Sequence, residues 1–202
     1  MSTPQVGGST GISPLNLQSM DLETALMMVQ TERTRLLDTQ LASQIEAVQA
    51  RNDQVAKLNN VLSALNKAVA SFASDAKATS KISNYDNAKV ESIEIPLNDA
   101  IQAAGISDLG FKKGEGSVTN PETGKVEKET GTNIMHKEVT KGELDAAITT
   151  IKGMIDSQSN SQQMDMLRLQ SLSNKRNEAF DVMTNFIKKM QDSRSSIIGN
   201  MR

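Results

Sequence analysis

The chain of 202 residues contains no cysteine, no tryptophan and a single histidine, His136. The lack of cysteine excludes disulfides, thiolate chemistry and cysteine-based metal sites. One histidine supports neither a histidine-based catalytic triad nor a metal site of several histidines, and we expect His136 to be an exposed loop residue. No nucleophile elbow or phosphate-binding glycine motif is present either. The sequence therefore predicts a protein that is not an enzyme and holds no cofactor or metal.

Aromatic residues make up only 2% of the chain, and 37% of its residues are hydrophobic. Compact cores usually rely on large aromatic side chains, whereas a long coiled coil fills its interior with aliphatic residues. With a net charge of −2, the chain lacks the excess of basic residues that nucleic-acid binding needs. No apolar run approaches the roughly 20 residues that cross a bilayer. We expect neither a nucleic-acid partner nor direct membrane insertion.

A long C-terminal helix is predicted for residues 142–202. It opens with Thr140 and Glu143, the spacing of a capping box, and no proline occurs after Pro121. A continuous helix of this length would extend roughly 85 Å. Its apolar residues recur with alternating spacings of three and four, which keeps them on one stripe. These residues are Leu144, Ile148, Ile151, Ile155, Leu169, Leu172, Ala179, Met183, Phe186, Met190 and Ile197.

A second long helix is predicted for residues 19–75, with a length similar to the first. Polar Gln44 and Arg51 stand at two positions of its apolar stripe, where polar residues weaken packing but can fix register. The matched lengths predict a mainly α fold, a long antiparallel helical hairpin closed by the segment between the helices. The stripe consists of Leu41, Val48, Val55, Leu58, Leu62, Leu65, Val69 and Phe72.

Two remaining segments differ in composition from the helices. Residues 1–18 carry no charge and are rich in Ser, Thr, Gln and Gly, which predicts either a plain disordered terminus or an uncleaved export signal. Residues 76–141 are predicted to form a small, exposed and partly irregular insert. Within it we expect a short strand at 90–95, a helix at 97–104 ended by Gly105, and at most one hairpin around 120–125.

A polar interruption marks the middle of the C-terminal stripe. Gln158 and Gln162 occupy stripe positions, followed by Asp165 and later Arg176. One interpretation is a loose or kinked region of the helix pair. The other is a zone that faces water, such as the lumen of a tube, or a polar layer between several subunits.

Beyond this interruption, apolar residues occupy more of the helix circumference than one partner helix needs. Phe180, Val182 and Ile187 lie outside the two rows that the stripe requires. A helix that is apolar on two faces is buried between several neighbours, which predicts self-assembly. The predicted helix and subunit interface comprises Leu41, Val48, Val55, Leu58, Leu62, Leu65, Val69, Leu169, Leu172, Phe180, Met183, Phe186, Ile187, Met190 and Ile197.

The order of these parts resembles the extracellular filament and needle-tip proteins of type III secretion systems, the EspA-like group with its relatives LcrV and IpaD. The segments that carry the resemblance are 18–22, 170–186 and 192–202, together with the uncharged start. The resemblance implies a secreted virulence protein of the bacterial cell surface that polymerises into a hollow helical filament. Such a filament extends the secretion needle and conducts effector proteins. The implied partners are other copies of the chain, the needle subunit, translocator proteins and a cytoplasmic secretion chaperone.

Two alternatives remain open at this point. A needle-tip cap would use the same helices in an assembly that closes rather than propagates. An intracellular coiled-coil adaptor would need no secretion at all.

Overall fold

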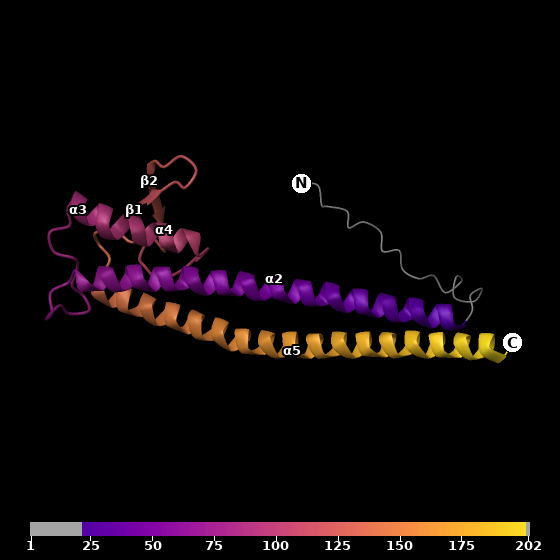
Figure 1. Ribbon diagram of the computed structural model, residues 1–202. Coiled ribbons are helices and arrows are strands. Elements are labelled where there is room, and N and C mark those ends of the chain that lie inside the picture. The colour runs from indigo at the N-terminus through magenta and orange to yellow at the C-terminus, as the bar shows by residue number, and fades with distance from the viewer. Residues whose placement is uncertain (1–21, 201–202) are drawn as a thin grey trace. The chain divides into compact units, whose positions relative to one another are not determined.

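The computed structural model describes residues 22–200 and is mainly helical (Figure 1). The residues predicted to form a flexible, export-signal-like start, 1–18, lie outside the described residues. Two long helices, α2 and α5, stand at either end of the described chain, and short elements lie between them. The elements are α2 (Leu22–Ala70), α3 (Asn87–Lys89), the π-helical turn η1 (Val90–Glu94), α4 (Ile95–Ala103), β1 (Gly114–Thr119), β2 (Val126–Gly131) and α5 (Lys141–Asn200).

Both long helices are continuous. Helix α5 runs for 60 residues without a break, as the absence of proline predicts. Helix α2 ends at Ala70, five residues before the expected end, because the residues that follow form a tighter turn of the 3₁₀ type. The Ser71 N–H donates to the Ala68 carbonyl and the Phe72 N–H to the Val69 carbonyl, which are three-residue rather than four-residue spacings.

The chain divides into two compact units, each of which contains part of α2 and part of α5. The core unit comprises Val48–Met164 and includes every short element. The two-helix unit comprises, among the described residues, 22–47 and 165–200.

The interior of the core unit is built from both long helices and the insert. Leu65 of α2, Leu97 of α4 and Leu144 of α5 are completely buried in one cluster. The sequence predicts an exposed insert, whereas Phe111 and Met135 of the insert are buried in the same cluster. Figure 1 shows α4 lying along α2, the position from which its apolar side reaches this cluster.

The strand predicted at residues 90–95 is wrong, because these residues are helical. The Asp86 side chain accepts the Lys89 N–H at 3.0 Å and caps the start of α3. The chain then continues through η1 into α4, where Pro96 occupies the first turn and needs no hydrogen-bond partner for its nitrogen. The end of α4 is as predicted, since Gly105 follows it with a φ of 66°.

The two strands form one antiparallel hairpin around residues 120–125. The sequence predicts no more than one hairpin at this place. Thr119 pairs with Val126 next to the turn, and Gly114 pairs with Gly131 at the open end. The Asn120 side chain accepts the Glu122 N–H at 2.9 Å, and Gly124 has a φ of 63°. These are the features that close a tight turn.

Glycine is required in β1 because the next segment packs directly against the strand. A Cβ at Gly116 would lie 2.0 Å from the Ile134 Cγ2 and 2.7 Å from the Met135 carbonyl oxygen. We therefore expect Gly116→Ala to lower the free energy of unfolding by about 3 kcal/mol, through overpacking. Gly153→Ala is the control, since no atom lies within 4 Å of its Cβ. It should stabilise α5 by about 1 kcal/mol. Urea denaturation measures the free energy of unfolding of both variants. Equal changes in the two variants would contradict the close packing at Gly116.

The predicted capping box begins α5. The Thr140 N–H donates to Glu143 Oε2 at 2.8 Å, and the Glu143 N–H donates to the Thr140 hydroxyl at 3.3 Å. The Lys112 N–H donates to the other carboxylate oxygen at 3.2 Å. Burial raises the pKa of Glu143, but these hydrogen bonds outweigh it and hold the pKa below 4.5.

This carboxylate should make part of the stability dependent on acid pH. A carboxyl group with a lowered pKa in the folded state stabilises the protein above its unfolded pKa, and this contribution is lost as the pH falls through the folded pKa. Glu143→Gln should lower the free energy of unfolding at pH 7 by about 1 kcal/mol. Below pH 4.5 this variant should lose less stability with falling pH than the wild type does. Thermal denaturation from pH 7 to pH 3 measures both. An unchanged acid slope would contradict the assignment.

Candidate functional site

Within each unit, side chains of α2 and α5 form hydrogen bonds across a contact between the two helices, and most of the predicted interface residues are half-buried or buried. We call this contact the seam. Leu58 and Leu65 are buried in the core unit, where Val48, Val55, Leu62 and Val69 are half-buried. In the two-helix unit the half-buried members are Leu41, Leu169, Leu172, Met183, Phe186, Ile187 and Met190. Phe180 differs, with 51% of its surface exposed. The side chain of Ile197 lies outside the described residues.

The polar residues predicted in the core unit's seam are paired across it. The Arg51 Nη1 donates to Gln158 Oε1 at 2.9 Å, and Gln162 Nε2 donates to Asn52. Gln158 therefore meets Arg51, one of the two polar interruptions in the first helix. Paired polar residues of this kind penalise any other alignment of two helices.

The two-helix unit contains further polar pairs. Gln44 Nε2 donates to Asp165 Oδ1 at 3.1 Å, and Arg176 Nε donates to Asp38 Oδ1 at 3.0 Å. Asp165 is 4% exposed and also lies 3.8 Å from Arg168. The α2 residue with the higher number, Gln44, pairs with the α5 residue with the lower number, Asp165. The two segments are therefore antiparallel within this unit.

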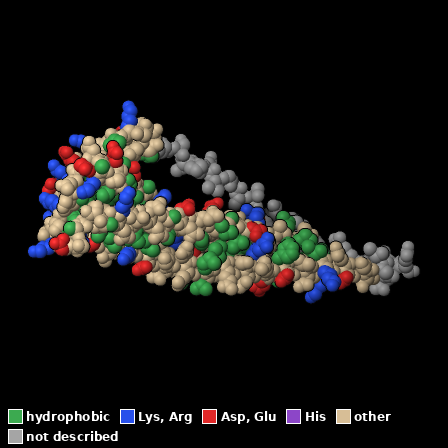
Figure 2. Space-filling view, turned by 60° about the vertical axis from the view of Figure 1, so that its left-hand side comes forward, with side chains coloured by type: hydrophobic (Ala, Val, Ile, Leu, Met, Phe, Trp, Pro, Cys, Tyr) green, Lys and Arg blue, Asp and Glu red, His purple; other side chains and the backbone are tan. Residues whose placement is uncertain are grey.

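Few residues are buried in the two-helix unit. Among its described residues, Ala179 and Asp165 are the only ones that are buried. The Gln30 Oε1 is buried and has no hydrogen-bond partner in the described part of the chain. Large apolar side chains are exposed instead, and Figure 2 shows hydrophobic side chains in patches on the helix surface. They are Leu26, Met28, Val29, Leu36, Ile45, Met166, Leu167, Phe180 and Val182.

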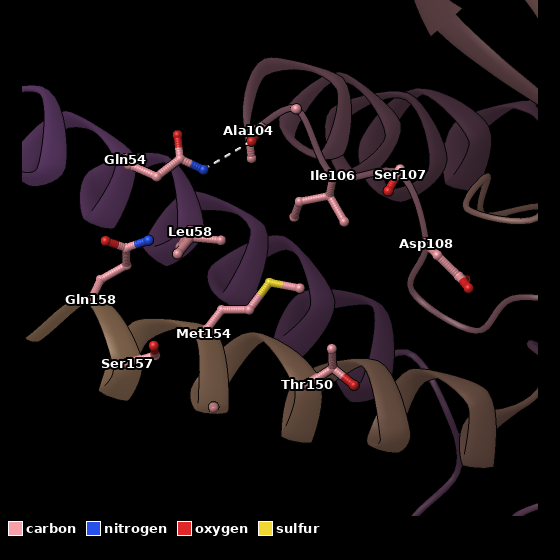
Figure 3. A pocket seen from close by; sticks show the side chains of 12 residues that line it. Gln54, Leu58, Ala104, Ile106, Ser107, Asp108, Thr150, Met154, Ser157 and Gln158 are labelled. Carbon is pink, nitrogen blue, oxygen red and sulfur yellow. Dashed lines mark hydrogen bonds between the residues drawn. The ribbon is translucent and has the colours of Figure 1, made fainter. Parts of the chain in front are cut away.

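A groove of about 490 Å³ lies in the core unit between α2, α5 and the loop after α4 (Figure 3). Leu58, Met154 and Ile106 point into it from these three elements. Gln54 at its edge donates to the Ala104 carbonyl at 2.9 Å. The one charged residue of the groove is Asp108, which accepts the Gly110 N–H at 2.7 Å. Gln54 connects the loop to α2, whereas the Asp108 contact lies within the loop, and these side chains offer no arrangement of acid, base and nucleophile.

A second hollow, of about 540 Å³, contains His136, Tyr85 and Glu94. His136 was expected on the surface and is instead 6% exposed, because its ring packs where a Cβ at Gly114 would lie. Its Nδ1 accepts the Glu138 N–H at 3.2 Å, so the proton on Nε2 faces the Lys112 carbonyl at 3.3 Å. Burial and a hydrogen bond to Glu94 raise the pKa of Tyr85. The ring of His136 is thus a packed interior group next to Gly114 of β1.

In residues 22–200 no group of three potential metal ligands gathers, and no helix is long and apolar enough to cross a membrane. No protein-family model, curated protein or solved structure matches the chain.

Proposed function

We propose that this protein is a structural subunit that self-assembles through its two-helix unit. The observation that carries the proposal is the contrast between the two units. Buried apolar side chains fill the core unit, whereas the two-helix unit has a single buried apolar residue, Ala179, among those described. Two helices that bury so little are unstable alone, since helices in water derive most of their stability from packing.

We further propose that α2 and α5 form one long antiparallel hairpin. The polar pairs support it, since those of both units run in the same antiparallel sense: Asp38 with Arg176, Gln44 with Asp165, and Arg51 with Gln158. Such a hairpin would present the two-helix unit for assembly and carry the insert on the core unit. The polar residues 158, 162, 165 and 176 would then set the alignment of the two helices in addition to any contact with a lumen.

The resemblance to type III secretion filament proteins supplies the biological setting of the proposal. The subunit would be secreted, held apart from its copies by a chaperone until export, and added to a hollow filament on a needle. Translocator proteins would occupy the far end. The absence of cysteine suits a chain that unfolds for export and refolds without oxidation.

Negative-stain electron microscopy of the concentrated protein, stepped through pH and salt, tests the proposal. Long uniform tubes are the expected result. Discrete rings or small particles would support the needle-tip cap instead, and compact monomers under all conditions would remove self-assembly. Detection of the protein in culture supernatant distinguishes a secreted subunit from an intracellular adaptor.

A further inference from the structure

Apart from Leu167, the exposed apolar residues of the two-helix unit lie on two different sides of the helix pair. In a heptad frame labelled a to g, the seam occupies positions a and d. Thr34 and Leu41 are a residues of α2, and Leu169 and Met183 are a residues of α5. Positions e and b lie on one side of the seam, and positions g and c lie on the other.

In an antiparallel pair, the e positions of both helices share one side and the g positions share the opposite side. The contacts of the unit agree with this frame. Asp38 and Thr31 are both e residues of α2, and they bond to Arg176 and Met183 of α5. The e side is therefore one continuous surface made by both helices.

Each side carries its own apolar patch. The e face consists of Ile45 from α2 with Met166, Phe180 and Ile187 from α5. The g face consists of Leu26, Val29 and Leu36 from α2 with Val182 from α5. All of these except the half-buried Ile187 are more than 40% exposed.

The g side carries an excess of positive charge. Among the described side chains of this unit, every charged residue at a g position is basic. The neighbouring c positions contribute the acidic Glu178 and Asp192, so cations outnumber anions on this side. Two g faces of separate copies would therefore repel each other. The basic g residues are Arg33, Arg168, Lys175 and Lys189.

The e side is nearly neutral by comparison. Arg194 stands at an e position near the end of α5, with its side chain outside the described part. The charged residues of this side whose side chains are described are Asp38 at an e position and Arg35 at a b position. Each is in an ion pair within the unit, Asp38 with Arg176 and Arg35 with Glu32. The exposed ring of Phe180 adds a surface that attracts Lys and Arg side chains. The g face can thus approach the e face of another copy without the repulsion that separates two g faces.

We propose that the e face of one copy binds the g face of a second copy, so that the faces form a single head-to-tail interface. This inference rests on the proposed self-assembly and specifies its geometry. A contact between two different surfaces leaves one surface of each kind free at the ends of the assembly. Repetition of the contact adds further copies, and it covers both apolar patches of every internal subunit.

Two variants that each lack one face test the proposal. Leu36→Glu places a carboxylate in the g face, and Phe180→Glu places one in the e face. Leu167→Glu is the matched control, because Leu167 is 60% exposed but occupies position f, directed away from the seam. Wild-type protein and each variant are compared by sedimentation velocity and electron microscopy, alone and mixed in equal amounts. Circular dichroism measures helicity in each case.

We expect each face variant to be monomeric alone, because it retains only one kind of face. Their equimolar mixture should stop at a dimer, since the intact e face of the Leu36→Glu protein can bind the intact g face of the Phe180→Glu protein. The Leu167→Glu protein should assemble like wild type. If the first pair loses helicity, Val29→Glu and Ile187→Glu serve as a second pair on the same two faces.

The other results overturn the inference. Dimers of either face variant alone would indicate a symmetric contact between identical faces. Wild-type assembly by both face variants, or loss of assembly by the Leu167→Glu control, would place the interface elsewhere and leave the proposed filament standing. A mixture without dimers would show that the faces do not bind each other. A wild-type chain that stays monomeric would mean that a different protein covers the patches, and the proposed function would fail as well.

Discussion

Asn98→Ala should lower the free energy of unfolding by about 3–5 kcal/mol, because the Asn98 amide joins three parts of the core unit. Its Oδ1 accepts the Met135 N–H at 2.8 Å, and its Nδ2 donates to the carbonyls of Met135 and Ser117 at 3.1 and 3.2 Å. Asn98 is 3% exposed and Met135 is fully buried, so water cannot replace these bonds. The loss should appear in urea denaturation followed by circular dichroism.

Asn59→Ala is the matched control for this prediction. Asn59 is exposed, and its Nδ2 donates to the Val55 carbonyl one turn earlier in α2. Its removal should change stability by less than about 0.5 kcal/mol, as for most surface substitutions. An Asn98→Ala protein as stable as the control would show that the amide does not hold α4 to β1 and to the segment before α5.

Phe111→Ala should destabilise the folded monomer by about 3–5 kcal/mol, the usual range for removal of a buried phenylalanine. Phe111 is 2% exposed and lies in the cluster formed with both long helices. Phe180→Ala is the contrasting variant, because Phe180 is 51% exposed. It should change monomer stability by less than about 1 kcal/mol while weakening assembly.

Denaturation at protein concentrations below assembly separates the two phenylalanines. Equal losses of stability would contradict the assignment of Phe111 to the interior and Phe180 to a contact between copies. A loss of monomer stability confined to Phe180→Ala would reverse the assignment.

Several elements could be predicted from the sequence because they depend on residues close together in the chain. The capping box at Thr140 and Glu143, the uninterrupted helix after it and the glycine that ends α4 all follow from local rules. Leu58 and Leu65 of the predicted stripe are buried in one cluster with Leu144 and Ile151 of α5. A heptad spacing determines which residues share a face of a helix, and that face must be covered.

The interior position of the insert could not be predicted in this way. Phe111 and His136 stand among glycines and charged residues, as loop residues do, yet both are buried. The strand expected at 90–95 failed for a related reason. Val90, Ile93 and Ile95 are β-branched and suit a strand, but the Asp86 cap and the packing of α4 against α2 favour a helical path.

The two long helices, and the residues that share one face of each, follow from the amino-acid sequence without further information. These properties depend on the spacing of apolar residues, which the chain carries locally. The burial of the insert in one unit, and the exposed apolar surface of the other, became evident only in the folded chain. Burial depends on which distant segments meet, and in this chain the segments between Ile82 and Val139 meet the long helices in the core unit only.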